Sequence, residues 1–466
     1  MRRTFIRLGF ILLIIVFNLF TFQNCSPFKT AVDVQLPSDQ STENQQNNSS
    51  ENEPSNPSPT PVPSLPAPVP PPVVMPIPAS PRGPTYYVGK SGSDANSCAK
   101  AQSSAPSDRK LTIEGGLSCV VGKAANTVVV GSGIYDEILT QANFRSGSSW
   151  ENAILLKSEV PFGAIIQPGS SRRAAFDLDW SSPPGESGRL AYVIIQDFDI
   201  DGSKMPNAVD ASGTGVRGLI KVWGNCSLGW VNHIRFQGNK IHNYKSSGNS
   251  GSTINTSGDT CKPNANYLEF INNEIYANGT SNQFSNTFYI QTSYNIFRGN
   301  KIHDSIGDGI RFSQQNGGSP SNNLAEGNEC WGLTRACIGM NGGNATNNLV
   351  FRNIGTGSSS DFCIEGSTSD PTNNEIYNNT CVGNAGGIVM SGSGNIIRNN
   401  IFYNNTTNIS VGSNNTLGHN LTTDPQFINL SLRNYTLKAG SSAIDAGFDV
   451  GQSFNGKAPD IGAIEY

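Results

Sequence analysis

One phrase recurs through the second half of the chain: Ile234–Arg235–Phe236–Gln237–Gly238–Asn239–Lys240–Ile241, and again Asn295–Ile296–Phe297–Arg298–Gly299–Asn300–Lys301–Ile302. In each copy, short runs of alternating apolar and polar residues flank a Gly-Asn pair. The asparagine returns about every 20 to 35 residues, which is a typical period of a solenoid repeat. It stands at Asn239, Asn273, Asn300, Asn328, Asn353, Asn379 and Asn400.

The alternating runs on both sides of the asparagine predict short strands whose apolar side chains face one interior. No hairpin turn signal separates successive copies, so we expect successive strands to run parallel. Asparagine tolerates the left-handed corner conformation, and it can hydrogen-bond to its copy in the next winding about 4.8 Å away. The sequence therefore predicts an all-β fold, a parallel β-helix in which each phrase forms part of one winding.

The composition fits a solenoid and argues against nucleic-acid binding. The chain has 466 residues, of which 14% are charged, and its formal net charge is -4. Such a chain lacks the basic stripe that binds nucleic acid. We therefore expect a monomer without a nucleic-acid partner. Binding of an acidic polymer would require a local group of cationic side chains.

Residues 1–25 have the layout of a bacterial secretion signal. Arginines precede an uncharged apolar run over residues 8–22, and Cys25 follows that run. The cysteine resembles a lipoprotein processing site, although an ordinary signal peptide or an uncleaved anchor remain alternatives. We expect an exported protein that is anchored at the bacterial cell envelope by a lipid on Cys25 and contacts the membrane only there.

Residues 26–84 are rich in Pro, Ser, Asn and Gln, and proline is dense from Pro57 to Pro84. Few large apolar side chains occur in this stretch, so it cannot bury a core. We interpret it as a disordered tether that holds the folded part away from the membrane.

Four cysteines lie just ahead of predicted strands, at similar places in adjacent windings: Cys226 and Cys261, and Cys337 and Cys363. Adjacent windings place Cα atoms about 5 Å apart, which is within disulfide range. Exported proteins permit disulfides. The sequence therefore predicts the pairs Cys226–Cys261 and Cys337–Cys363.

The remaining cysteines give a third pair and two free thiols. We expect Cys98–Cys119 to staple the N-terminal part. Cys330 and Cys381 align as inward positions two windings apart, about 10 Å, which is too far for a disulfide. They are expected to be buried thiols.

The start of the folded part resembles a known family. Thr85–Tyr86–Tyr87–Val88 precedes Gly92 and Asp94, and Asn126–Thr127–Val128–Val129–Val130 begins a second strand about 40 residues later. Leu111 to Val121 has the spacing of a short helix between them. This arrangement resembles the bacterial right-handed parallel β-helix proteins of the pectate-lyase-like superfamily, whose first strands are plugged by a helix. The resemblance covers residues 85–466.

The C-terminal stretch resembles the closing segment of secreted members of that superfamily. It includes Thr423–Asp424–Pro425–Gln426–Phe427 and Pro459–Asp460–Ile461–Gly462–Ala463. A solenoid needs a cap because its last winding exposes strand edges and core. We thus expect a β-helix over 85–420 and a cap over 421–466, with Asp445 and Asp460 serving as turn residues.

The resemblance implies that substrate binds along one outward strand face, and alternation places that face in this chain. In Gly309–Ile310–Arg311–Phe312–Ser313 the apolar residues point inward, so Arg311 and Ser313 point outward. An outward side chain contributes little to the core, so Arg311→Ala should barely change the melting temperature. The same alternation predicts an outward column of Lys221, Asn255, Tyr289, Arg311, Gly339, Glu365 and Val389.

A second outward column follows the asparagine corners and consists of His242, Tyr276, His303 and Trp331. Stacked rings on a parallel face could bind the flat face of a sugar. Outward aromatic residues can instead shield strands, and that reading stays open. Three acidic residues elsewhere, Asp197, Asp199 and Asp201, could hold Ca²⁺, although they read more readily as turn residues.

We weigh two functions, and a passive structural spacer stays open as a third. The first is a surface-anchored module that binds a polysaccharide or cell-envelope glycan through Tyr289 and the aromatic column. The resemblance implies an alternative, a polysaccharide lyase acting on a uronate polymer by calcium-assisted β-elimination. Its base or clamp would be Lys221 or Arg311, its proton shuttle His303, and its Ca²⁺ ligands Asp308, Asp361 and Glu365. The dense basic and acidic signatures of characterised lyases are missing, so the sequence favours binding.

Overall fold

The computed structural model describes residues 83–178, 189–205, 218–224, 231–245, 251–258, 265–279, 284–314, 318–357, 362–368 and 370–466. The predicted pair Cys226–Cys261, the lipid site Cys25 and the proposed Ca²⁺ ligand Asp361 lie outside these residues. By its contacts the chain divides into two units, Met1–Leu65 and Pro66–Tyr466, and the fold belongs to the second. No helix in the described ranges is long and apolar enough to cross a membrane.

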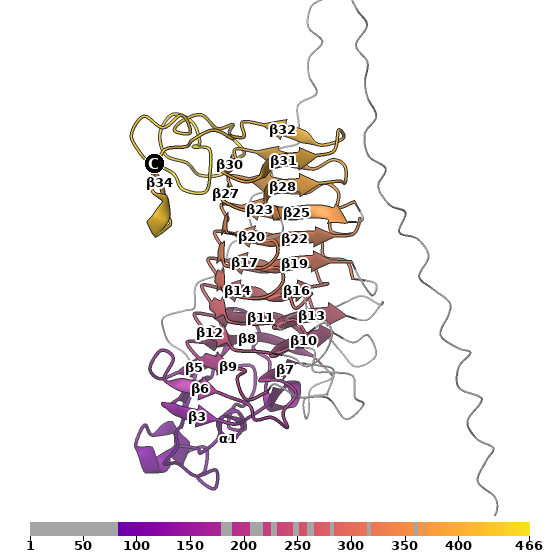
Figure 1. Ribbon diagram of the computed structural model, residues 1–466. Coiled ribbons are helices and arrows are strands. Elements are labelled where there is room, and N and C mark those ends of the chain that lie inside the picture. Colours follow the sequence, from indigo (N-terminus) through magenta and orange to yellow (C-terminus); the bar gives the residue numbers. More distant parts are fainter. Residues whose placement is uncertain are drawn as a thin grey trace, which may run out of the picture. The chain divides into compact units, whose positions relative to one another are not determined.

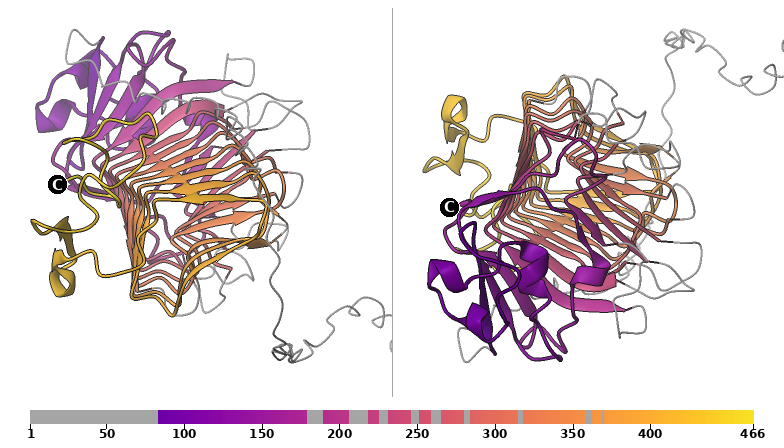
Figure 2. Two further views of the ribbon diagram at one scale, coloured as in Figure 1. Left: turned by 90° about the horizontal axis from the view of Figure 1, so that it is seen from above. Right: turned by 90° about the horizontal axis from the view of Figure 1, so that it is seen from below.

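Three long parallel sheets wind around one interior (Figures 1 and 2). Each winding passes through sheet A, sheet B and sheet C in that order, so the predicted parallel β-helix is confirmed. Sheet A consists of β1 (Thr85–Val88), β2 (Thr127–Val130), β5 (Ile154–Ser158), β8 (Leu190–Gln196), β11 (Val231–Gln237), β14 (Glu269–Ile271), β17 (Ile296–Arg298), β20 (Leu324–Glu326), β23 (Leu349–Phe351), β26 (Glu375–Tyr377), β29 (Ile396–Arg398) and β32 (Thr416–Gly418). Sheet B consists of β3 (Gly133–Tyr135), β6 (Ala164–Ile166), β9 (Asp199–Asp201), β12 (Lys240–His242), β15 (Glu274–Tyr276), β18 (Lys301–His303), β21 (Glu329–Trp331), β24 (Ile354–Thr356), β27 (Thr380–Val382) and β30 (Ile401–Tyr403). Sheet C consists of β4 (Leu139–Thr140), β7 (Phe176–Leu178), β10 (Ile220–Gly224), β13 (Ile254–Gly258), β16 (Phe288–Ile290), β19 (Ile310–Ser313), β22 (Ile338–Asn341), β25 (Phe362–Thr368), β28 (Gly386–Met390) and β31 (Thr407–Val411).

The interior is lined by buried apolar residues and contains columns of identical side chains. Phe236, Phe270 and Phe297 of sheet A are fully buried and stack with ring centroids 5.5 Å apart. Phe288 of sheet C meets the Phe270 ring edge-on at 5.0 Å. Burial of each such ring contributes roughly 1.5 to 3 kcal/mol, so stacked aromatic residues hold neighbouring windings together.

The predicted asparagine ladder runs along the corner between sheets A and B. The Asn300 side-chain NH₂ donates to Asn328 Oδ1 at 2.9 Å and to the Phe270 carbonyl at 2.8 Å. Its backbone N–H also donates to Asn328 Oδ1, at 3.0 Å. The sequence reasoning missed a second ladder at the corner between sheets C and A, which consists of Asn295, Asn323, Asn348, Asn374, Asn395 and Asn415.

The N-terminal end of the solenoid is covered by a short helix, α1 (Ile113–Leu117), inside the range predicted for it. Thr112 caps the helix, since its hydroxyl accepts from the Gly115 N–H at 2.9 Å. Ile113 and Leu117 are buried. Gly116 sits so close to the core that a Cβ there would lie 2.4 Å from Val88. The helix therefore plugs the first winding.

The C-terminal segment includes an antiparallel hairpin of β33 (Phe427–Asn429) and β34 (Asn434–Leu437). Phe427, Tyr435 and Leu437 pack against Ile354 and other outward residues of sheet B. The predicted turn roles are also seen, because Asp460 Oδ1 accepts from the Asp445 N–H at 2.8 Å. The segment thus lies on the side of the solenoid.

The disulfides only partly follow the prediction. Cys98–Cys119 is present, with Cα atoms 5.3 Å apart. The pair Cys337–Cys363 is wrong, and so are the two free thiols: the pairs are Cys330–Cys337 and Cys363–Cys381.

The physical reason lies at the corner between sheets B and C. Cys330 projects inward from sheet B, and the chain brings Cys337 back beside it at the entrance to sheet C, with Cα atoms 5.6 Å apart. Gly355 stands between Cys330 and Cys381 in the register of sheet B. A Cβ at Gly355 would lie 2.4 Å from Cys363 Sγ, so its missing side chain makes room for the second disulfide.

Candidate functional site

The outer face of sheet C carries the predicted column in the predicted register. Lys221 pairs with Asn255, Asn255 with Tyr289, Tyr289 with Arg311, and the series continues to Gly339, Glu365 and Val389. A second outward column, two residues further along each strand, includes Trp223, Ser257, Gln291, Ser313 and Asn341. These two columns, with Asp177 one winding before Lys221, are called the polar face of sheet C.

At one end of the polar face, Asp177 is buried between two cations. Lys221 Nζ lies 3.6 Å from Asp177 Oδ1, and Arg173 forms an ion pair with Asp177 Oδ2. The Lys221 ammonium also lies 4.3 Å from the centroid of the Trp223 ring, within the range of a cation–π contact. The Lys221 side chain remains 17% exposed. We call these four residues the Lys221 cluster.

The sequence reasoning missed Asp177. Its strand, Phe176–Asp177–Leu178, alternates apolar and polar residues like its neighbours. Extension of the column by one winding before Lys221 would have identified Asp177.

Further along the polar face lies the Arg311 cluster: Asp308, Arg311, Arg335 and Glu365. Arg311 Nη1 donates to Glu365 Oε2 and lies 3.4 Å from Asp308 Oδ2. Arg335 Nη1 lies 3.8 Å from the same Asp308 oxygen. Arg311 can reach Glu365 two windings away because Gly339 stands between them, and a Cβ at Gly339 would lie 2.7 Å from Arg311 Nη1.

The charges of the Arg311 cluster are buried. The Arg311 and Glu365 side chains are 8% and 3% exposed, so Arg311 is not the exposed groove residue that the sequence predicted. Burial alone raises the pKa of Glu365, but Arg311 and the hydrogen bonds from Ser367 outweigh it and lower the pKa below its ordinary value. Glu365 is therefore ionised at neutral pH.

This pairing bears on the proposed catalytic and calcium roles. The Arg311 guanidinium is already engaged by the Asp308 and Glu365 carboxylates, so it is poorly placed to clamp a substrate carboxylate. Asp308 and Glu365 face this guanidinium rather than an open cation site. Among the described residues no group of three or more His, Cys, Asp or Glu side chains could hold a metal ion.

Tyr289 lies between the two clusters. Its hydroxyl accepts a hydrogen bond from Ser313 Oγ at 3.1 Å, and its side chain is half-buried. Burial raises its pKa, while Ser313 and Arg311 oppose the rise. Tyr289 therefore stays a neutral phenol at the polar face.

The predicted aromatic column forms a continuous stack on the outer face of sheet B. His242, Tyr276, His303 and Trp331 have adjacent ring centroids 4.8, 5.1 and 4.2 Å apart. The last ring is covered by the Arg433 guanidinium at 4.0 Å. Both ring faces of Tyr276, His303 and Trp331 are thus occupied by neighbours.

The structure does not bring His303 to Arg311, because their strands belong to sheets B and C. His303 Nδ1 instead lies 2.8 Å from Asp304 Oδ2. The alternative calcium residues are also engaged, since Asp199 Oδ1 lies 2.8 Å from His242 Nε2 and Asp201 Oδ1 accepts from the Ser203 N–H at 2.9 Å. Phe198, not Asp199, occupies the ladder position below Asn239.

A second aromatic stack, not predicted, lies at the corner between sheets C and A. Tyr192, His233, Tyr267 and Tyr294 have centroids 4.5, 5.0 and 5.1 Å apart. All four residues have a positive φ. The available signal was an aromatic residue three positions before the inward residue of each sheet A strand, as in Tyr294–Asn295–Ile296–Phe297.

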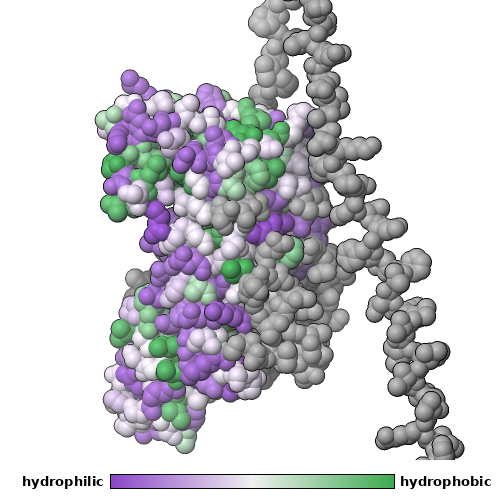
Figure 3. Space-filling model, viewed as in Figure 1, coloured by the Kyte–Doolittle hydropathy of each residue, from purple (hydrophilic) through white to green (hydrophobic). Residues whose placement is uncertain are grey.

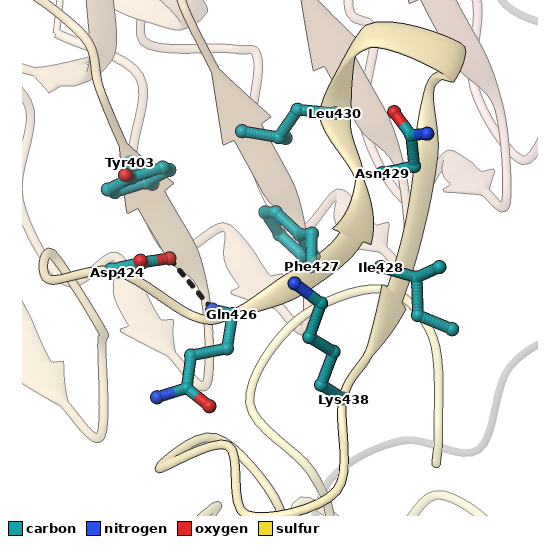
Figure 4. Close-up of a pocket in the computed structure, with 8 residues that line it drawn as sticks. All are labelled: Tyr403, Asp424, Gln426, Phe427, Ile428, Asn429, Leu430 and Lys438. Carbon is teal, nitrogen blue, oxygen red and sulfur yellow. Dashed lines mark hydrogen bonds between the residues drawn. The ribbon is translucent and has the colours of Figure 1, made fainter.

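A hollow of about 570 Å³ lies between the C-terminal hairpin and sheet B (Figure 4). Its lining is Tyr403, Asp424, Gln426, Phe427, Ile428, Asn429, Leu430 and Lys438. Asp424 Oδ1 accepts from the Gln426 N–H at 2.8 Å. The lining contains no residue of the polar face of sheet C, so the two features are separate.

No protein-family model matches the sequence, and no curated protein matches it. Similar solved structures include pectate lyase Pel9A, with a TM-score of 0.52 and 15% identity over 83% of this chain and 97% of that chain. They also include XylC in complex with xylose, with a TM-score of 0.47 and 12% identity over 69% of each chain. A third is the PL6 family alginate lyase AlyGC, with a TM-score of 0.37 and 14% identity over 64% of this chain and 48% of that chain. The likeness to Pel9A shows the fold, a right-handed parallel β-helix.

Proposed function

We propose that this protein binds a polysaccharide along the polar face of sheet C. One observation carries the proposal: hydrogen-bonding and charged side chains are aligned over successive parallel strands of one face. The strand spacing of about 4.8 Å repeats along this face, so a chain molecule laid across the windings meets a regular series of polar groups.

The two clusters would have different roles in binding. The Lys221 cluster combines a partly exposed ammonium with an indole ring, and this pair suits an acidic or hydroxyl-rich sugar. The Arg311 cluster is buried and internally paired, so it would keep the face rigid. A rigid face lowers the entropy cost of binding a polymer.

Elimination on a uronate polymer is the second candidate, and Lys221 is the residue that could act as its base. Pel9A, which shares the fold, is a pectate lyase. Against this role, the Lys221 ammonium is engaged in an ion pair with the buried Asp177 carboxylate, 3.6 Å away. We therefore propose that Lys221 binds an anionic or polar group.

Purified protein lacking residues 1–25 tests the proposal. This deletion leaves the second unit, Pro66–Tyr466, whole. Calorimetric titration with neutral and uronate polysaccharides should give binding, and Lys221→Met should weaken it about tenfold or more, because a hydrogen bond to a charged group contributes roughly 1.5 to 3 kcal/mol.

The matched control is Lys240→Met on sheet B, whose side chain is 34% exposed. It should bind like the unaltered protein. Equal affinity of both variants would remove Lys221 from the binding face. With calcium present, new ultraviolet absorbance from an unsaturated sugar would show elimination, and its dependence on Lys221 would favour the lyase.

We also propose that the protein is exported and tethered at the cell envelope through Cys25. The apolar run before Cys25 and the proline-rich stretch after it support this arrangement. Labelling of cells with an alkyne fatty acid should mark the protein, and Cys25→Ser should abolish the label. A label that persists in Cys25→Ser would place the lipid elsewhere.

A further inference from the structure

The C-terminal end of the solenoid exposes core positions. Leu417 of β32 stands in the inward column of sheet A directly above Ile397. Leu417 is 45% exposed, whereas Ile397 is fully buried. Ile409 and Val411 of β31, the last inward residues of sheet C, are only partly buried. The last winding therefore ends in apolar side chains.

The C-terminal segment does not cover this end. Its apolar residues pack on outward residues of sheet B, as described above, and Val450 packs on Phe351 and Tyr377 at the outer face of sheet A. Seen from above, the segment lies beside the solenoid rather than over its last winding (Figure 2, left). Hydrophobic residues gather over the last windings in the space-filling view (Figure 3).

The hydrogen-bond ladders also stop at this end. The backbone N–H groups of Asn395 and Asn400 donate to Asn415 Oδ1 and Asn420 Oδ1, each at 3.0 Å. Within the described part of the chain, Asn415 and Asn420 are the last members, and no further winding offers acceptors to their N–H groups. β31 and β32 are the edge strands of sheets C and A.

The last winding lacks two of the devices that protect a strand edge, charged side chains and proline. Natural edges carry charged residues or proline, which prevent pairing with other chains. Residues 399–423 contain no Asp, Glu, Lys, Arg or Pro. This edge is therefore uncharged, and β31 and β32 have no further strand partner among the described residues.

We propose that this end is the interface of a homodimer. The N-terminal end is plugged by α1, whose Ile113 and Leu117 are buried, so a head-to-tail stack of copies is blocked. Contact is therefore possible only between the C-terminal end of one copy and the C-terminal end of a second copy. Such an isologous contact has two-fold symmetry and gives a closed dimer. The uncharged edge imposes no repulsion between copies. A dimer replaces the monomer expected from the sequence.

The two-fold axis makes facing strands antiparallel. β31 has 5 residues and β32 has 3, so β31 is the longer free edge. In the dimer, β31 pairs with β31 of the second copy, and Leu417, Ile409 and Val411 become buried.

Sedimentation velocity on the protein lacking residues 1–25 tests the proposal over a wide dilution range. The unaltered protein should show a dimer that dissociates on dilution. Leu417→Asp should weaken it roughly 100-fold or more, because the dimer would desolvate an unpaired carboxylate. The matched control is Leu432→Asp in the C-terminal hairpin, where Leu432 is 77% exposed; it should dimerise normally.

Hydrogen exchange of the peptide over residues 407–418 supplies a second readout, with slow exchange expected in the dimer and fast exchange after dilution. A monomer with fast exchange at every concentration would overturn the proposal. A monomer with slow exchange that becomes fast after removal of residues 26–82 would also overturn it. That result would mean that the chain's own N-terminal segment, and not a second copy, covers the end. A dimer lost in Leu432→Asp but kept in Leu417→Asp would place the interface on the hairpin.

Discussion

Replacement of Arg311 by methionine should destabilise the fold strongly, contrary to the sequence expectation of almost no change. Methionine keeps much of the side-chain volume but removes the cation. Glu365, 3% exposed, would lose its guanidinium partner, and the fully buried Asp308 would keep only the Arg335 guanidinium, 3.8 Å away. Removal of one partner of a buried ion pair costs about 3 to 5 kcal/mol. Urea denaturation followed by circular dichroism measures the loss of unfolding free energy.

The stability loss in Arg311→Met should also depend on pH. Because the folded-state pKa of Glu365 is lowered, its contribution to stability is present above the ordinary carboxyl pKa and is lost as pH falls through the folded-state value. The difference between the unaltered protein and Arg311→Met should therefore shrink on acidification. In the variant, Glu365 can take up a proton and relieve its buried charge.

Arg298→Met is the matched control. Arg298 Nε lies 2.5 Å from Glu326 Oε2 on sheet A, and these side chains are 27% and 21% exposed. A partly exposed pair of this kind contributes about 1 kcal/mol or less. Equal losses for Arg311→Met and Arg298→Met, or a difference that does not change with pH, would refute the reasoning about the Arg311 cluster.

Three further predictions follow from the interior. Gly355→Ala should lower the free energy of unfolding by about 1 to 3 kcal/mol, because the new Cβ would lie 2.4 Å from Cys363 Sγ. It should also open the neighbouring disulfide, so that a colorimetric reagent detects free thiols. A variant with no free thiol and unchanged stability would contradict this. Asn328→Ala should destabilise by more than Asn420→Ala in urea denaturation, since Asn328 bonds to windings on both sides and Asn420 ends its ladder; equal losses would argue against a ladder that supports the windings. Mass spectrometry of unreduced peptides should link Cys330 to a peptide directly downstream, and a link to another winding would contradict the structure.

The sequence predicted the strand register well because alternation is local. Once Ile310 and Phe312 are assigned to the interior, Arg311 must point outward, and each neighbouring strand repeats the same pattern. The register from Lys221 to Glu365 follows from this rule alone. The asparagine ladder was equally readable, since its residues recur beside a fixed apolar pattern.

Burial and pairing could not be read from the same rule. An outward direction does not mean exposure, and the Arg311 side chain is 8% exposed. The ion pair between Arg311 and Glu365 depends on the space left by the missing side chain of Gly339. Such a space can be recognised only in the three-dimensional structure. The disulfide error has a similar origin, because similar places along one sheet suggest a pair between windings, whereas Cys330 and Cys337 meet across a corner.

The contact between Arg433 and Trp331 makes Trp331 an intrinsic fluorescence probe of the C-terminal hairpin. Trp331 belongs to β21 in the middle of the solenoid, and the guanidinium that covers it comes from the hairpin near the C-terminus. Indole emission depends on nearby charge and on access of water to the ring. Detachment of the hairpin would therefore change the fluorescence of a tryptophan about a hundred residues upstream, so undocking of this segment could be followed without any added dye.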